Sequence, residues 1–169
     1  LFTRAYKRAT AVTFYSRRLL ERANELGLAR PGCHVIYPPV ASSFAFHGNA
    51  EQAAQRRGLR LTPAHVLINV KRLHPLAGQR YLIEAMPAIL RGAPETWLVV
   101  VGEGSQDGEL KALAASLPPP VADRVVFTGR REDVAAITGE IDVAVLPSLR
   151  EAQGISILEA MARRKPVVA

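Results

Sequence analysis

The sequence predicts a doubly wound α/β domain with a parallel sheet, and this prediction rests on three observations. From residue 62 onward, short apolar runs alternate with longer amphipathic stretches. The short runs are rich in Val and Ile, and Gly, Pro or acidic turns bound most of them, which is typical of strands buried on both faces. The strand–helix–strand pattern occurs four times in succession, so right-handed crossovers are expected, with ligands at the carboxyl ends of the strands.

Five strands and four helices are expected in this region. The strands are predicted at Val66–Val70, Trp97–Val101, Arg124–Thr128, Ile141–Leu146 and Pro166–Ala169. Apolar residues recur at intervals of three and four in the stretches that we predict to be helices. These helices are Gln79–Arg91, Asp107–Leu117, Arg131–Thr138 and Gly154–Arg164. The three prolines at Pro118–Pro120 predict a stiff loop between the second helix and the next strand.

The first 60 residues have a different rhythm, and we interpret them as the end of one unit and the connection to the next. Ala11–Tyr15 is predicted to be a strand. Ser16 is predicted to be the N-cap of a basic helix over Arg17–Leu26, which ends at a glycine. His34–Val40 is predicted to be a strand interrupted by its prolines, and Ala41–Asn49 a polar loop.

The charge is distributed unevenly along the 169 residues, whose net charge is +7. Residues 1–65 hold 10 basic and 3 acidic residues, whereas residues 66–169 hold 12 of each. This excess suggests that the first part meets nucleic acid, an anionic membrane or an acidic ligand, although solvated Arg-rich helices would give the same pattern.

Composition excludes several classes of protein. A hydrophobic content of 49% excludes disorder of the whole chain, and the single cysteine excludes an internal disulfide or a Cys-rich zinc site. No run approaches the roughly 18 apolar residues of a membrane-spanning helix, and the first residues lack the apolar core of a signal peptide.

The densest group of candidate site residues follows the strand that is predicted to end at Leu146, where an α/β sheet places its ligands. Glu151 and Glu159 would lie about 12 Å apart along one continuous helix, too far to act together. If the helix begins near Gly154, Glu151 lies in the loop and can turn towards the same crevice. The first N–H groups of that helix could then bind a diphosphate, and Glu159 could accept hydrogen bonds from a sugar diol. The spacing alone also fits two carboxylates on the surface.

The order and spacing of these motifs resemble those of the family 4 glycosyltransferases, which are retaining enzymes of the two-domain GT-B fold. The similar segments are Leu146-Pro-Ser, Glu151, Gly154-Ile, Glu159-Ala-Met-Ala, Lys165-Pro-Val-Val-Ala and, upstream, Asn69-Val-Lys-Arg-Leu with Gly78, Leu98 to Gly104 and Val125 to Gly129. The resemblance implies that residues 1–45 are the end of an acceptor domain and the interdomain linker. Residues 46–169 would be a nucleotide-sugar-binding, Rossmann-like domain truncated at its C-terminus.

By this resemblance, four residues of the last predicted helix and the loop before it contact the donor. Glu159 would hold the nucleotide ribose, and Glu151 would bind a hydroxyl of the donor sugar as a catalytic residue. The backbone at Gly154 and Ile155 would contact the sugar and the phosphates.

The resemblance assigns the other site residues to the ends of earlier strands. Arg72 would be the second catalytic residue and pair with the diphosphate, since its planar fork can bind two oxygens at once. The loop at Gly129 and Arg130 would lie beside the base. The family has a second phosphate-binding lysine where this chain has Ala77, and side-chain alternation is expected to point Lys71 away from Arg72.

The resemblance implies transfer of a hexosyl unit from a UDP-, GDP- or ADP-sugar to a glycan or lipid-linked acceptor, with retention and with neither a cofactor nor a metal. A cytoplasmic location, peripheral at the inner face of the membrane, and a role in cell envelope polysaccharide biosynthesis are expected. Nucleic acid is not expected as a partner, and the chain by itself is expected to be inactive. The alternative is a non-catalytic nucleotide-binding module of the same fold, whose basic N-terminal surface docks on membrane or nucleic acid.

Overall fold

The structure is a computed structural model, and it describes Tyr6, residues 8–46 and residues 65–169. Its contacts divide the chain into two compact units, which we describe separately. The first unit consists of Leu1–Pro39 with Glu151–Gln153, and the second of Val40–Arg150 with Gly154–Ala169.

The first unit contains two short parallel strands and the helix that connects them. β1 (Val12–Phe14) pairs with β2 (Cys33–Val35), and α2 (Arg17–Glu25) lies between them in the sequence. The prediction that Ser16 is the N-cap is confirmed, because its Oγ accepts a hydrogen bond from the N–H of Leu19 at 3.3 Å. A hydroxyl cap of this kind satisfies one of the helix's unpaired donors.

The predicted strand over His34–Val40 is wrong beyond its second residue, since β2 ends at Val35. Pro38 and Pro39 have no N–H to donate to a neighbouring strand, which disfavours a longer ladder here.

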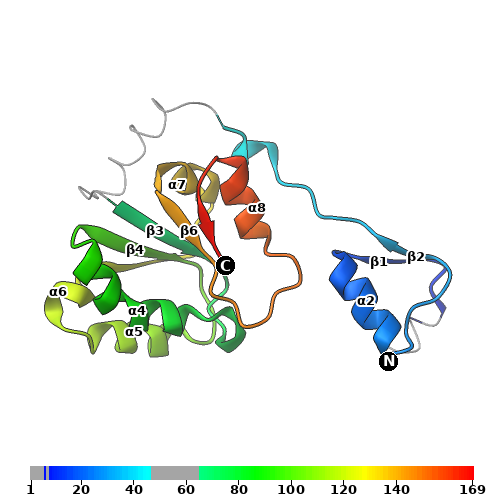
Figure 1. The fold of residues 1–169 in the computed structure, drawn as a ribbon, viewed down its shortest axis with the longest axis horizontal. Helices are drawn as coiled ribbons and strands as arrows, with labels where there is room; N and C mark the ends of the chain where they lie inside the picture. Colours follow the sequence, from blue (N-terminus) through cyan, green and yellow to red (C-terminus); the bar gives the residue numbers. More distant parts are fainter. Residues whose placement is uncertain (1–5, 7, 47–64) are drawn as a thin grey trace. The chain divides into compact units, whose positions relative to one another are not determined.

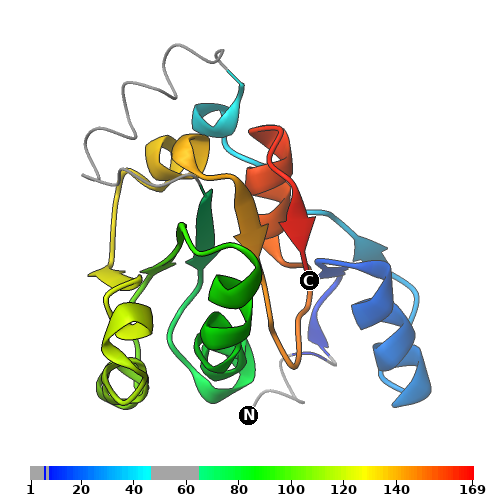
Figure 2. The same ribbon diagram turned by 60° about the vertical axis from the view of Figure 1, so that its left-hand side comes forward.

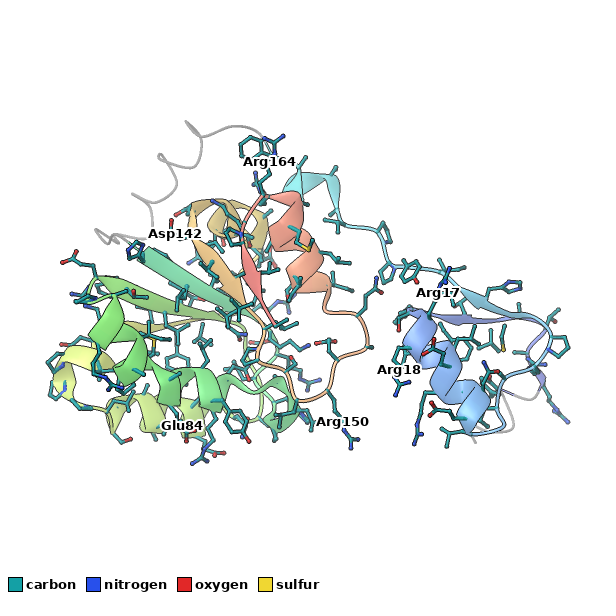
Figure 3. The ribbon with its side chains drawn as sticks, viewed as in Figure 1. Arg17, Arg18, Glu84, Asp142, Arg150 and Arg164 are labelled. Carbon is teal, nitrogen blue, oxygen red and sulfur yellow. The ribbon has the colours of Figure 1, made fainter. Side chains whose placement is uncertain are left out.

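The arginines of α2 do not form a uniformly basic surface. Arg18 lies 3.7 Å from Glu21 and 3.6 Å from Glu25, and Arg22 lies 2.8 Å from Glu25. Figure 3 shows Arg17 and Arg18 on this helix. The carboxylates offset part of the basic charge, and contact with an anionic membrane stays a prediction. Within the described parts of the chain, no helix is both long and apolar enough to cross a membrane.

The second unit is built on a parallel sheet of five strands in the order β5–β4–β3–β6–β7 (Figure 1). The strands are β3 (His65–Val70), β4 (Thr96–Val101), β5 (Val125–Gly129), β6 (Val143–Val145) and β7 (Val167–Val168). The chain moves outward from β3 to β5 and then returns to β6 on the other side of β3. The predicted doubly wound fold is therefore confirmed, and its order reverses between β3 and β6, where such sheets bind their ligands.

Helices cover both faces of this sheet (Figures 1 and 2). They are α4 (Gln79–Gly92), α5 (Asp107–Ala115), α6 (Pro119–Ala122), α7 (Val134–Glu140) and α8 (Ile155–Ala162). Leu98 and Val100 of β4 pack with α4 and α5 in one core cluster. Val99 and Val101 of the same strand pack with α7 and α8 in the other. Because successive strand residues face opposite sides, a strand covered on both faces needs an unbroken apolar run.

Two of the differences from the predicted elements concern helices. α7 begins at Val134 rather than at Arg131, whose guanidinium lies 2.6 Å from the Asp133 carboxylate in the turn before the helix. The predicted loop at Pro118–Pro120 contains the start of the short helix α6. Proline is well suited to a first helical turn, because its missing N–H would have no partner there.

β6 is shorter than the predicted strand over Ile141–Leu146. Ile141 is the C-cap of α7, and the Asp142 carboxylate accepts a hydrogen bond from the N–H of Val66 at 2.7 Å (Figure 3). This contact joins the amino ends of the chain segments at β6 and β3, at the edge opposite to the expected ligand site.

The predicted polar loop over Ala41–Asn49 contains a short 3-10 helix, η1 (Ser42–Phe44), whose Phe44 side chain is buried. The buried guanidinium of Arg163, at the end of α8, donates hydrogen bonds to the Ala45 carbonyl at 2.9 Å and to a carbonyl of α7. These contacts attach η1 to the second unit. The last residues of the predicted loop lie outside the described part of the chain.

Candidate functional site

The carboxyl ends of β3, β4 and β5 surround an open pocket of about 720 Å³. It is lined by Arg72, Glu103, Gly104, Ser105 and Arg130. Arg72 follows β3, and Arg130 follows β5. The three other lining residues, Glu103 to Ser105, follow β4. Neighbouring parallel strands end at the same edge of the sheet, so the topology brings together two predicted site residues that are distant in the sequence.

Close backbone packing fixes the wall of this pocket between β3 and β4. The N–H of Leu73 donates to the Glu103 carbonyl at 3.0 Å. A Cβ on Gly102 would lie 2.1 Å from the Lys71 carbonyl oxygen, and one on Gly104 would lie 2.2 Å from that of Leu73. Both distances are shorter than any real contact, so the two glycines allow the β4 loop to approach the end of β3.

Gln79 is a buried polar residue of the site that the sequence analysis did not single out. Its side chain is 1% exposed, and its Nε2 donates a hydrogen bond to the Arg72 carbonyl at 3.2 Å. The sequence does indicate that Gln79 is buried. It precedes the buried residues of α4 by three, four and seven positions, which places it on the same helix face; these residues are Leu82, Ile83 and Met86. A polar side chain on a buried face needs a partner, and here that partner is the backbone of the predicted catalytic arginine.

Asn69, the first residue of the Asn69-Val-Lys-Arg-Leu motif, is another buried polar residue, and it lies at the switch point of the sheet. It is fully buried, and its Nδ2 donates to the Val145 carbonyl at 2.8 Å, which joins the ends of β3 and β6. The signal in the sequence is a single amide side chain within the otherwise aliphatic run Val66–Val70.

The connection from β3 to α4 packs against the connection that leaves β6. It contains a 3-10 turn, η2 (Pro75–Ala77), followed by Gly78 with a φ of +73°. A Cβ on Gly78 would lie 1.8 Å from the Pro147 carbonyl oxygen. The N–H of Leu149 donates to the Leu76 carbonyl at 2.9 Å. Position 78 therefore requires glycine both for its backbone conformation and for this approach.

The structure shows what stands where the resembled family has its second phosphate-binding lysine. Ala77 is buried at 3% exposure, and Lys71 is half-buried and does not line the pocket. His74 has a local role, because its Nδ1 accepts a hydrogen bond from the N–H of Leu76 at 3.3 Å at the start of η2.

Arg130, directly after the end of β5, lines the pocket on the side opposite to Arg72 in the strand order. β5 ends at Gly129, whose φ is +68°, and the register with β4 shifts so that Val101 pairs with Gly129. The Gly129 carbonyl accepts a hydrogen bond from the N–H of Gly102 at 2.9 Å. The next residue, Arg130, is exposed and lines the pocket.

α8 begins directly after Gly154, as predicted, and carries the remaining donor-site candidates of the second unit. Gly154 has a φ of +65°, and its carbonyl accepts from the N–H of Ile157 at 2.9 Å. Ile155 is 43% exposed, and Glu159 is half-buried. Burial raises the pKa of the Glu159 carboxyl, since desolvation disfavours the charged form. None of these residues lines the pocket that holds Arg72.

Glu151 lies in the stretch Glu151–Gln153, which groups with the first unit. Its Oε1 accepts a hydrogen bond from the N–H of Ala152 at 3.0 Å. The predicted contact of Glu151 with a donor sugar stays a prediction, as does the role of each other predicted site residue.

Glu159→Gln is expected to make the free protein more stable at neutral pH. The folded-state pKa of Glu159 is raised above its unfolded value, so ionisation favours the unfolded state. The free energy of unfolding of the native protein therefore falls as the pH rises through the folded pKa, whereas the variant lacks this loss. In urea denaturation, the variant should have the higher free energy of unfolding at pH 7. Below about pH 4 the two proteins should have the same free energy of unfolding, because glutamate is protonated there in both the folded and the unfolded state. A native protein that is equally stable or more stable at pH 7 would contradict this.

Among the described residues, no group of three or more His, Cys, Asp or Glu side chains converges as a metal site requires. Transfer without a metal ion remains a prediction.

The fold and the pocket define the class of protein: a doubly wound α/β domain with two arginines at the carboxyl edge of its sheet. Within the described chain, neither Arg72 nor Arg130 forms an ion pair, so both charges are available to an anion. A family model described as "Glycosyl transferases group 1" matches residues 64–169. The chain belongs to this family, and its architecture is that of the GT-B glycosyltransferases.

Two curated relatives match almost the whole chain. The GDP-mannose-dependent alpha-(1-6)-phosphatidylinositol monomannoside mannosyltransferase of Mycolicibacterium smegmatis is 33% identical, over 95% of this chain and 44% of its own length. The 2-deoxystreptamine glucosyltransferase of Streptomyces kanamyceticus is 30% identical, over 98% of this chain and 43% of its own length. The chain thus spans less than half the length of these relatives.

Solved structures show the same fold. The Anabaena protein Alr3699/HepE in complex with UDP-glucose superposes with a TM-score of 0.85 at 27% identity, over 98% of this chain and 46% of that one. WaaG, a glycosyltransferase involved in lipopolysaccharide biosynthesis, superposes with a TM-score of 0.80 at 23% identity, over 92% of this chain and 42% of that one.

Proposed function

We propose that the chain is the donor-binding part of a retaining glycosyltransferase that moves a hexosyl unit from a UDP-, GDP- or ADP-sugar to a glycan or lipid-linked acceptor. The observation that carries this proposal is the pocket with Arg72 and Arg130 at the carboxyl edge of the sheet, in a chain of this family. A nucleotide diphosphate sugar fits such a pocket because its diphosphate is anionic.

The relatives support the choice of ligands. The mycobacterial relative is described as GDP-mannose-dependent and as acting on a phosphatidylinositol mannoside, and the Anabaena structure contains UDP-glucose. A nucleotide sugar as donor and a lipid-linked or glycan acceptor are consistent with both.

Arg72 acts on the leaving group in the proposed mechanism. Transfer of the sugar breaks its bond to the diphosphate, so negative charge develops on the departing oxygen. A guanidinium held at this oxygen stabilises that charge, and preorganised groups of this kind often provide the largest part of catalysis. Gln79 holds the Arg72 backbone and so limits how far the arginine can move away from the reacting atoms.

The two carboxylates orient the donor. Glu159 accepts hydrogen bonds from the ribose hydroxyls, and Glu151 accepts one from the sugar. Correct orientation of bound reactants can lower a barrier by about 7–11 kcal/mol in the best cases. The free N–H groups at the start of α8 supply a further contact for the sugar or the phosphates.

Glu159→Ala is expected to weaken donor binding in the full-length protein by about 10- to 100-fold, since hydrogen bonds to a charged acceptor contribute about 1.5–3 kcal/mol each. The measurement is the Kd of the preferred donor, found by a thermal-shift panel of UDP-, GDP- and ADP-sugars and then determined by calorimetry.

Glu84→Ala is the matched control, because Glu84 is an exposed helix carboxylate that pairs with Arg80 at 2.9 Å (Figure 3). An unchanged donor Kd in Glu159→Ala would contradict the ribose assignment. Donor binding by the native protein without turnover would instead favour the non-catalytic module. Proton NMR of the product's anomeric signal tests retention.

A further inference from the structure

We propose that the side chain of Arg130 binds the donor's diphosphate together with Arg72, and so supplies the second cation of this site. The inference rests on the proposed function and deepens it, because it assigns to a phosphate contact a residue that the sequence analysis placed beside the base.

The strand order brings Arg72 and Arg130 to the same edge of the sheet. Arg72 and Arg130 follow β3 and β5, the strands on either side of β4, and both side chains line the same pocket. Ser105, whose side chain carries a hydroxyl donor, also lines this pocket. A diphosphate bridges two cations that face one cavity more readily than it is held by one, because each guanidinium can take a separate pair of oxygens.

The net charge of the pocket depends on Arg72, Arg130 and Glu103. Both arginines are exposed, and among the described residues neither has a carboxylate partner within ion-pair distance. Glu103 lines the same pocket, and its negative charge offsets one of them. With Arg72 alone, the pocket would be neutral and would have little attraction for a diphosphate. Arg130 makes its net charge positive.

Lys71 is another cation next to Arg72 in the sequence. Lys71 precedes Arg72 but does not line the pocket. Its N–H donates to the Val101 carbonyl at 3.0 Å directly after β3 ends. Arg130 is therefore better placed than Lys71.

The neighbouring arginine provides a matched control. Arg131 lies in the same loop, but two of its nitrogens donate to the Asp133 carboxylate, at 2.8 and 2.6 Å. Its charge is already balanced, and it does not line the pocket. Arg131→Gln removes the same charge from the same loop without touching the proposed contact.

The experiment is calorimetric titration of the full-length protein with UDP, GDP and ADP, followed by the free nucleoside of the one that binds most tightly. Arg130→Gln should weaken the diphosphate complex about 10-fold and leave nucleoside binding within about 2-fold, since charge-assisted hydrogen bonds are the strong ones. Arg131→Gln and Lys71→Gln should each change the diphosphate Kd by less than about 2-fold, because neither side chain reaches the pocket.

The assignment would be overturned by an unchanged diphosphate Kd in Arg130→Gln. An equal loss for nucleoside and diphosphate would also overturn it, because that result would assign Arg130 to the base. A loss in Lys71→Gln that matches or exceeds that of Arg130→Gln would also overturn it. If the native protein binds none of the three diphosphates, the proposed function fails and this inference fails with it. Binding by the native protein with no effect of Arg130→Gln refutes the inference alone.

Glu103→Gln is the complementary test, because it removes a negative charge from the pocket that is proposed to bind the phosphates. The diphosphate should bind about 2- to 3-fold more tightly to this variant, as expected for a partly solvated like charge. Weaker or unchanged diphosphate binding would show that the phosphates do not lie beside Glu103, and would overturn the placement of the diphosphate in this pocket.

Discussion

Gly78→Ala is expected to lower the free energy of unfolding of the second unit by about 2–5 kcal/mol, the sum of about 1–2 kcal/mol for the left-handed backbone and about 1–3 kcal/mol for the overpacked contact. The alanine Cβ would lie 1.8 Å from the Pro147 carbonyl oxygen, and the φ of +73° is unfavourable for any residue with a Cβ. Pro147 cannot simply move away, because the hydrogen bond from Leu149 to Leu76 fixes its segment against the η2 turn.

Gly129→Ala separates these two contributions. Gly129 has nearly the same φ, +68°, but a Cβ there has no atom within 4 Å. We expect this variant to lose only about 1–2 kcal/mol, the cost of the left-handed conformation alone. Urea denaturation followed by the fluorescence of Trp97 measures both, because this single tryptophan lies on β4 of the second unit. Equal losses in the two variants would show that the approach of Gly78 to Pro147 contributes nothing.

Arg72→Ala is expected to reduce the kcat of the full-length enzyme about 100- to 1,000-fold, the range found when one group that stabilises a developing charge is removed. The reason is that negative charge on the diphosphate increases as the bond to the sugar breaks, so the guanidinium binds the transition state more strongly than the donor. Steady-state kinetics with the preferred nucleotide sugar give kcat and KM separately. The KM for the donor should rise much less than kcat falls.

Arg80→Ala is the control for Arg72. Arg80 lies at the start of α4, just beyond the same connection, but its guanidinium pairs with Glu84 at 2.9 Å and does not line the pocket. Arg72→Lys should retain part of the rate, because lysine keeps the charge and loses the two-pronged geometry. A higher KM with an unchanged kcat in Arg72→Ala would mean that the arginine only holds the bound donor, and the proposed role in turnover would be wrong.

Most of the second unit could be predicted because its signals are local. Continuous apolar runs, helical patterns of apolar residues and the glycines that bound them can each be recognised within a short stretch of sequence. As a result, β3, β4, α4 and α8 begin within two residues of their predicted positions. The errors occur where a local pattern competes with a specific contact. Asp142 looks like part of a strand, but its carboxylate accepts a hydrogen bond from β3, and Arg131 looks helical but pairs with Asp133.

The site was predictable only in part for the same reason. Arg72, Gly129 and Arg130 could be named because each lies at or just after the end of a strand, within a recognisable motif. Gln79 and Asn69 could have been noticed as polar residues at buried positions, but their partners, the Arg72 and Val145 carbonyls, could not be read from the sequence. Such partners depend on how separate segments pack.

By itself, the sequence determined the parallel α/β architecture, the helix start at Gly154 and the candidate residues, because periodicity and motif spacing act over short stretches of chain. Only the tertiary structure decided that Arg72 and Arg130 share one pocket, that Lys71 stands outside it, and that Gly78 must approach Pro147. These facts follow from the strand order β5–β4–β3–β6–β7, which brings chain segments far apart in sequence to one edge of the sheet. No local pattern specifies the distances across that edge.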